Sequence, residues 1–143
     1  MIRFEAEEPS LLPAGRLRLR RWLQALAAAY GQRCRTVTYV FMTDEQLLEV
    51  NRQYLAHDYY TDIITFDNRE VAGVGAIEAD IFVSVERVAD NAATYGVASA
   101  HELRRVLAHG LLHLLGLGDK TEAEATQMRQ AEDQALALWE ATA

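Results

Sequence analysis

The sequence predicts an α+β fold, in which a small mixed β-sheet of about four strands is covered by helices. Short β-branched and aromatic runs alternate with longer segments whose apolar residues recur at helical spacing. Both prolines precede the first long helical segment. The chain has 143 residues, of which 50% are apolar and 24% charged, which is the size and composition of one globular domain. We therefore expect residues 1–143 to form a single domain.

The pattern of residues 1–42 predicts one helix followed by one strand. An edge strand at residues 2–4 is expected to precede them. Apolar residues recur at helical spacing between Leu17 and Tyr30, and Gly31 follows where a helix commonly ends. Residues 36–42 are β-branched and aromatic, as is typical of a strand.

A helix and two more strands are expected next. Thr43 and Gln46 have the spacing of a capping box, in which a Ser or Thr side chain bonds the backbone three residues later. This pattern predicts a helix that runs to about Tyr54. Residues 62–66 and 80–84 are rich in Ile, Phe and Val and are predicted to be strands.

Three helices are expected after these strands. The first follows directly, over about residues 85–95. The other two each open on a capping box. The pairs that form these boxes are Ser99 with Glu102 and Thr121 with Glu124. The middle helix is expected to run to about Leu115.

Charge is distributed unevenly along the chain. In total, 14 Lys and Arg oppose 21 Asp and Glu, which gives a formal charge of −7. Residues 1–35 hold seven Arg against three Glu, a net +4, so the remainder carries −11. A net anion does not bind nucleic acid indiscriminately, but a local basic face can bind it selectively. The alternative interpretation is that these arginines form a solvated helix face.

The composition also indicates a compartment. Cys34 is the single cysteine and cannot form an internal disulfide, which favours a reducing environment. The N-terminus is acidic, whereas a signal peptide is basic and then apolar. No apolar run reaches the roughly 18 residues that a membrane helix needs. We expect a soluble, cytoplasmic protein with no membrane partner.

The strongest indication of chemistry lies in residues 108–119, AHGLLHLLGLGD. His109 and His113 are four residues apart and share one face of the expected helix. Their neighbours are almost all Leu, so we expect a buried helix whose imidazoles have little water and need polar partners. A divalent cation would satisfy both, because neutral imidazole binds zinc at about 2.0–2.1 Å. The alternative is a pair of core histidines bonded to carbonyl groups.

Gly110 lies inside this helix, where glycine costs about 1 kcal/mol relative to alanine. It indicates that another group approaches the backbone closely between the two histidines. A packing contact with a neighbouring helix or strand would also explain it.

Asp119 is the candidate third ligand. Gly116 and Gly118 allow the chain to leave the helix and fold back, and Thr121 already supplies the cap of the next helix. Two His and one Asp leave a fourth position for water, which is the pattern of a catalytic zinc site. Cys34 and His57 stay open as further candidates.

These segments resemble the YbeY family, the bacterial rRNA maturation endoribonucleases. The family pattern H-G-x-L-H-L-x-G-Y-D-H is similar to residues 109–119. The patterns N-x-x-Y and D-x-x-T-D, followed by two hydrophobic residues and S/T-F, match residues 51–54 and 58–66. A third pattern, G-D-I-x-I-S, resembles residues 79–84. The blocks occur in the family's order and spacing.

The chain departs from the family pattern at two positions. Asp119 stands where the family has its third histidine, so the implied site is His-His-Asp. Leu55 stands where the family commonly has an arginine that is implicated in activity. Arg52 and His57 lie nearby but do not match that position, so the sequence assigns no catalytic side chain beyond the metal ligands.

The resemblance implies metal-dependent hydrolysis of single-stranded RNA in rRNA processing and ribosome maturation. One zinc ion would be bound by His109, His113 and Asp119, although a carboxylate ligand also suits Mg or Mn. The implied partners are an rRNA precursor and the ribosome or its proteins, and the arginines of the first helix are expected to guide the phosphate backbone.

Two alternatives remain. One is a zinc peptidase, which is disfavoured because Gly110 stands where the H-E-x-x-H motif has its glutamate. The other is a non-catalytic, ribosome-associated factor with a structural metal.

Overall fold

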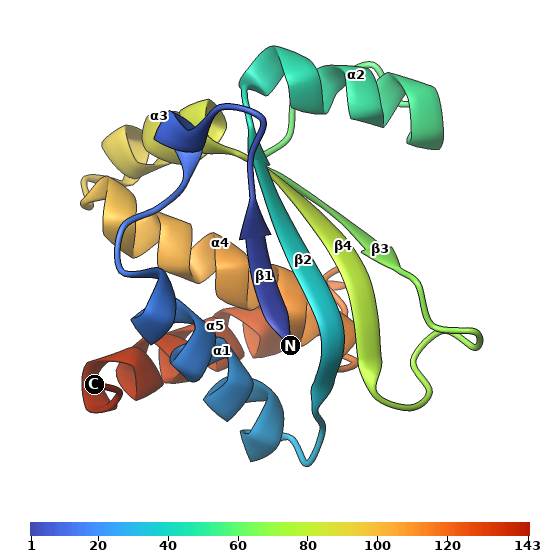
Figure 1. Cartoon of the computed structure of the whole chain (residues 1–143), viewed down its shortest axis with the longest axis vertical. Helices are drawn as coiled ribbons and strands as arrows, with labels where there is room; N and C mark the ends of the chain where they lie inside the picture. The colour runs from blue at the N-terminus through green and yellow to red at the C-terminus, as the bar shows by residue number, and fades with distance from the viewer.

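A four-stranded sheet in the order β1-β2-β4-β3 forms the centre of the fold (Figure 1). The computed structural model describes residues 1–143. The strands are β1 Ile2–Glu5, β2 Cys34–Met42, β3 Ile63–Asp67 and β4 Ile77–Ser84. β1 pairs with β2 and β2 with β4 in parallel, whereas β3 is antiparallel to β4. The predicted α+β class, the mixed sheet and the edge strand are confirmed.

Five α-helices surround the sheet. They are α1 Arg16–Ala29, α2 Asp44–Leu55, α3 Val85–Tyr95, α4 Ser99–Leu114 and α5 Glu122–Ala141, and a short 3-10 helix spans Pro9–Leu11. Figure 1 shows α4 crossing behind the strands with α5 next to it, α1 to the side of β1, and α2 at the end of the sheet where β2 finishes. No helix combines the length and the apolar character that crossing a membrane would require.

The core lies between the sheet and α4. Alternate residues of the two central strands face it, and Tyr39 and Ile81 are fully buried. The Tyr39 hydroxyl donates to the carbonyl of Leu107 in α4 over 2.9 Å. The leucines of α4 fill the same core, so this helix is fixed against the centre of the sheet.

Gly110 marks the closest approach of α4 to the sheet. A Cβ atom at this position would lie 2.8 Å from Cδ1 of Ile63 and 3.3 Å from Cγ2 of Ile81. The packing explanation for this glycine is therefore correct, because β3 and β4 leave no room for a side chain.

Two of the three predicted capping boxes are confirmed. Thr43 with Gln46 and Thr121 with Glu124 form both of the reciprocal bonds. The third prediction is wrong, because Ala98 is the N-cap of α4 and no side chain caps it. Glu102 is instead buried and lines a pocket.

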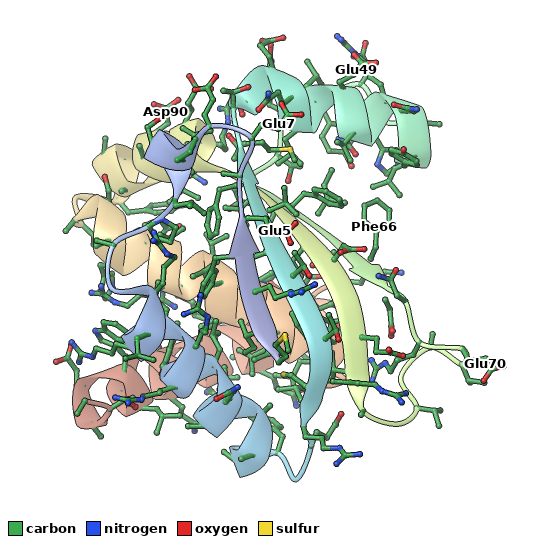
Figure 2. All side chains as sticks on the ribbon, in the orientation of Figure 1. Glu5, Glu7, Glu49, Phe66, Glu70 and Asp90 are labelled. Atoms are coloured by element: carbon green, nitrogen blue, oxygen red, sulfur yellow. The ribbon has the colours of Figure 1, made fainter.

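The end of α4 is held from the loop between β3 and β4. Arg69, which is buried in this loop, donates to the carbonyl of Leu114 over 2.9 Å and to that of Gly75 over 3.3 Å. Asp67 accepts from the same guanidinium through both carboxylate oxygens. The tip of the loop, with Glu70, points away from this contact (Figure 2). Arg69 thus fixes the point at which the chain leaves α4 for the turn to α5.

Candidate metal centre

A cavity of about 420 Å³ lies between the C-terminal half of α4 and the segment from α2 to β3. His109, His113 and Asp119, the three predicted ligands, all line it. His57 and Tyr59 line the opposite wall. The structure therefore brings the three residues to one cavity, which we call the metal cavity.

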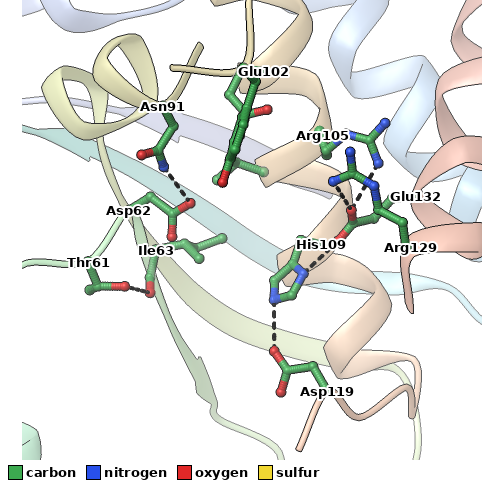
Figure 3. A pocket seen from close by; sticks show the side chains of 12 residues that line it. Thr61, Asp62, Ile63, Asn91, Glu102, Arg105, His109, Asp119, Arg129 and Glu132 are labelled. Atoms are coloured by element: carbon green, nitrogen blue, oxygen red, sulfur yellow. Dashed lines mark hydrogen bonds and ion pairs between the residues drawn. The ribbon is translucent and has the colours of Figure 1, made fainter. Parts of the chain in front are cut away.

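His109 lies between two carboxylates (Figure 3). Its Nδ1 is 2.8 Å from Oε2 of Glu132 in α5, and its Nε2 is 3.4 Å from Oδ2 of Asp119. The hydrogen bond to Glu132 is the main reason why the pKa of His109 is raised, although burial opposes it. Because a carboxylate accepts, Nδ1 carries the hydrogen and neutral His109 has its lone pair on Nε2. That lone pair faces Asp119, so the carboxylate favours a positive charge, either a proton or a metal ion, at Nε2.

His113 has the same tautomer. Its Nδ1 lies 3.2 Å from the carbonyl oxygen of Leu117, which can only accept a hydrogen bond. Nε2 is thus left with a free lone pair. Metal-ligating histidines almost always donate their second ring N–H to a carboxylate or a carbonyl group, and both histidines do so here.

The expectation that both imidazoles are shielded from water is wrong. His113 is exposed and the His109 side chain is 30% exposed. The adjacent leucines point to the core from the other side of α4, and the histidines occupy the face that borders the metal cavity. Leucine neighbours in the sequence therefore do not bury a histidine when the helix separates the two faces.

The three residues do not form a closed cluster. No group of three or more His, Cys, Asp or Glu side chains in the chain is close enough together to hold a metal ion. The donor chemistry of two imidazoles and one carboxylate nevertheless fits zinc or a harder divalent ion. The ligand roles of His109, His113 and Asp119 stay predictions.

The turn that carries Asp119 contains Gly116 and Gly118, and each position requires glycine for a different reason. Gly116 has a φ of 112°, a conformation that side-chain-bearing residues rarely adopt. At Gly118 a side chain would collide with the carboxylate of Glu124. Thr121 caps α5, so Asp119 is free of a capping role, as expected.

The opposite wall is held by Asn51, which is buried. Its side-chain amide donates to the carbonyl of Tyr59 over 2.8 Å, and its backbone carbonyl accepts from the His57 N–H over 3.1 Å. The His57 and Tyr59 rings stack with centroids 5.1 Å apart, and Nδ1 of His57 lies 2.9 Å from the Tyr59 hydroxyl. His57, which the sequence left open, therefore borders the metal cavity.

The other residues that the sequence left open do not line this cavity. Arg52 pairs with Asp58 on the surface, and Cys34 lies in β2 away from both walls. Leu55 does line the cavity, so the wall is apolar at the position of the family's arginine.

A second cavity, of about 410 Å³, shares His109 and Asp119 with the first (Figure 3). Asp62, Glu102 and Glu132 contribute carboxylates to it. Burial raises the pKa of Asp62 and of Glu102. Sequence reasoning missed all three residues. The sequence pattern predicts a capping role for Glu102, and Asp62 and Glu132 come near His109 only through tertiary packing.

Part of the basic N-terminal segment is used inside the protein. Arg18 donates to the carbonyls of Trp139 and Thr142, both over 2.8 Å, and its guanidinium lies over the Trp139 ring. Arg20 donates to the carbonyl of Ile2 over 3.2 Å. These two arginines of α1 therefore stabilise the fold, which reduces the basic face expected from the sequence.

The family model described as Endoribonuclease YbeY matches residues 12–140. The chain belongs to the YbeY family. The resemblance seen in residues 51–66, 79–84 and 109–119 is thus confirmed, and so is the expectation of membership in a family of RNA-cleaving hydrolases.

Individual relatives agree with this assignment. The Endoribonuclease YbeY of Cytophaga hutchinsonii is 51% identical over 123 residues, which cover 86% of this chain and 85% of the relative. That of Bacteroides thetaiotaomicron is 47% identical over 82% of this chain and 83% of the relative. The solution structure of TM1509 from Thermotoga maritima has the same fold, with a TM-score of 0.68 at 23% identity over 97% of this chain and 89% of that one.

Proposed function

We propose that this protein is a cytoplasmic, metal-dependent endoribonuclease that cuts single-stranded RNA during ribosomal RNA processing and ribosome maturation. The observation that carries the proposal is the position of His109 between Glu132 and Asp119, which favours a positive charge at Nε2. The family membership supports RNA as the substrate. The ribosomal context, with an rRNA precursor and ribosomal proteins as the partners, is what the resemblance to the YbeY family implies.

His109, His113 and Asp119 would hold one divalent ion, zinc by the preference of imidazole, or Mg or Mn by that of carboxylate. Such an ion, when bound, lowers the pKa of a coordinated water to about 7 and polarises a phosphoryl oxygen. Glu132 and the carbonyl of Leu117 orient the two imidazoles, so that neither ring has to be fixed when the substrate arrives.

The opposite wall supplies hydrogen-bond donors to the substrate. The Nδ1 of His57 is engaged with the Tyr59 hydroxyl, which leaves Nε2 available. A phosphodiester in the metal cavity lies between these two residues and α4. We assign His57 the role of contacting a phosphate oxygen, in a wall whose shape is set by Asn51.

A zinc peptidase is disfavoured by the packing of α4. The general base of such enzymes follows the first histidine of the motif. A side chain at Gly110 would collide with Ile63, so the fold has no space for a glutamate there. The non-catalytic ribosome factor would bind RNA without cutting it, and its metal would be structural.

The test is cleavage of a fluorescent single-stranded oligoribonucleotide by the purified protein, with a deoxyribonucleotide of the same sequence and casein as comparisons. We expect RNA cleavage that a chelator abolishes and a divalent metal restores. Asp119→Ala should lower the metal content measured by elemental analysis, whereas His101→Ala should not, because His101 lies on α4 outside both cavities. Chelator-resistant cleavage, casein digestion or RNA binding without cleavage would each contradict the proposal.

A further inference from the structure

The second cavity contains carboxylates that the metal centre does not use. We call it the acidic pocket and define it by Asp62, Asn91, Tyr95 and Glu102, on the side of His109 that faces α3. It shares His109 and Asp119 with the metal cavity, so the two spaces adjoin (Figure 3). A group bound in the acidic pocket therefore lies next to a phosphate at the candidate metal centre.

Glu102 is the most informative residue of this pocket. It is only 5% exposed, and its carboxylate takes part in none of the hydrogen bonds or ion pairs of the structure. Its carboxylate oxygens are not among the fully buried polar atoms that lack a partner, so the carboxylate reaches the solvent-filled space of the pocket, where the donor of a ligand can replace water. Its pKa is raised, first by burial and then by the charge of Asp62. Glu102 is thus a buried acceptor that a ligand can satisfy.

Asp62 adds a second acceptor. The only side chain that bonds it is Asn91, whose Nδ2 lies at the long distance of 3.4 Å from Oδ2. Burial raises the pKa of Asp62 as well. The charges of Asp62 and Glu102 interact across the pocket, and no side chain other than that of Asn91 donates to either carboxylate.

The nearby cations do not supply the missing donors. Arg105 donates to Glu132 over 3.0 Å and to Asp133 over 2.8 Å. Arg129 lies 3.9 Å from Glu132. Arg105 is thus engaged by the acidic residues of α5, Arg129 is exposed at the edge of the pocket, and neither donates a hydrogen bond to Asp62 or Glu102.

Tyr95 gives the pocket an aromatic side. It lines the pocket at the end of α3 and is 61% exposed, although its ring is large and apolar. An exposed aromatic side chain beside buried hydrogen-bonding groups is the arrangement with which proteins bind unstacked bases of single-stranded RNA.

We infer that the acidic pocket is a nucleobase subsite that selects guanine next to the scissile phosphate. Guanine presents two adjacent N–H donors, N1–H and the 2-amino group, which two neighbouring carboxylates can accept. Adenine and cytosine present an acceptor nitrogen beside their amino group, and uracil presents two carbonyls, so each would place lone pairs against Asp62 or Glu102. This inference rests on the proposed RNA-cleaving function.

The test uses single-stranded oligouridylates that carry one central guanine, inosine or adenine, with cleavage mapped on gels and affinity measured by fluorescence anisotropy. Inosine keeps N1–H but lacks the 2-amino group. We expect cleavage beside the guanine, and a value of kcat/KM about tenfold lower for inosine, which is the size of one lost hydrogen bond to a charged group.

Glu102→Gln and Asp62→Asn should reduce the ratio of guanine to inosine cleavage to about one. Asp90→Asn is the matched control, because Asp90 is exposed on α3 outside the pocket (Figure 2) and should leave the ratio unchanged. Should the buried substitutions impair folding, Tyr95→Ala at the exposed rim tests the same subsite. It should weaken the binding of all three oligonucleotides.

The outcomes separate this inference from the proposed function. Chelator-sensitive cleavage at equal rates beside guanine, inosine and adenine would overturn the subsite and leave the nuclease. No cleavage of any RNA would contradict the nuclease itself. A loss of bound divalent metal in Glu102→Gln, without a change in base preference, would show that the acidic pocket holds a cation and would overturn the guanine assignment.

Discussion

The carboxylate of Glu132 lies 2.8 Å from Nδ1 of His109, across a separation of 23 residues in the chain. Glu132 is buried in α5 and also accepts from Arg105. The orientation of the first candidate ligand of α4 is thus determined by a residue of the following helix, which packs against it along its length.

Glu132→Gln tests this relationship through metal binding. The substitution keeps the shape of the side chain but replaces the charged acceptor, so the His109 ring is held less firmly and is less basic. We expect an affinity for zinc roughly 10–100-fold lower. Competition with a chromophoric chelator measures it. Glu140→Gln, at an exposed position of the same helix, serves as the control, and equal losses in both variants would contradict the role of Glu132.

The same hydrogen bond predicts a pH dependence of the metal-free protein. The pKa of His109 is raised from its ordinary value of 6.5, mainly by Glu132. The charged imidazole therefore stabilises the fold fully below that value, and this contribution is lost as the pH rises through the folded-state pKa. An NMR titration of the His109 ring should give a lower pKa in Glu132→Gln. An unchanged pKa would contradict the assignment.

Gly110 predicts a coupling between α4 and the sheet. Gly110→Ala gains helix propensity but places a Cβ against Cδ1 of Ile63, and we expect it to lower the free energy of unfolding by about 1 kcal/mol. Ile63→Val removes the atom in closest contact. In that background Gly110→Ala should lower the free energy of unfolding by less. Urea unfolding of the four proteins of this double-mutant cycle measures the difference. Equal costs in both backgrounds would disprove the contact.

The Asp67–Arg69 pair at the end of α4 is expected to lose its stabilising effect in acid. Its pKa is lowered from 3.8 to about 2, chiefly by the hydrogen bond with Arg69. The stabilisation is therefore complete above 3.8 and is lost as the pH falls through about 2. Asp67→Asn leaves Arg69 buried without its partner and should destabilise the protein by about 2 kcal/mol at pH 7.

The difference in unfolding free energy between wild type and Asp67→Asn should shrink as the pH falls below 3.8. Glu70→Gln, at the exposed tip of the same loop, provides the comparison and should follow the wild type at every pH. A constant gap between wild type and Asp67→Asn would indicate that the loss arises from something other than the titration of Asp67.

His57 is expected to act on the substrate and not on the metal. His57→Ala should lower kcat/KM for RNA about tenfold, the size of one hydrogen bond to a phosphate oxygen. The metal content by elemental analysis should not change, because His57 lies on the opposite wall of the cavity. A loss of metal in this variant would make His57 a ligand instead.

The parts of the fold that the sequence predicts well depend on local patterns. Helical spacing and β-branched runs predict the sheet and five helices because neighbouring residues decide them. Two capping boxes formed as expected for the same reason. At Ser99 the identical pattern failed, because α4 begins one residue earlier than the pattern requires, with Ala98 as its N-cap, and the side chain of Glu102 is buried in the acidic pocket.

Only part of the candidate site can be predicted from the sequence, because the rest depends on tertiary contacts. The spacing of His109 and His113 and the glycines before Asp119 are local signals. Glu132 bonds His109, and the charge of Asp62 acts on it, only because α5 and the segment before β3 pack near α4, which no periodicity of their own sequence indicates. The arginines of α1 show the same limit, since the carbonyls that bind Arg18 come from the other end of the chain.

Arg69 determines which wall of the metal cavity can move. Its guanidinium ties the β3–β4 loop to the last turn of α4, so this side behaves as a single rigid unit with the sheet. The segment between α2 and β3 has no regular secondary structure, is held by Asn51 and by bonds of surface side chains such as Arg52 with Asp58, and carries exposed rings. Amide protons of residues 56–62 should therefore exchange with solvent well before those of α4. An incoming polynucleotide would displace the segment of residues 56–62, while α4 and the turn that follows it keep their positions.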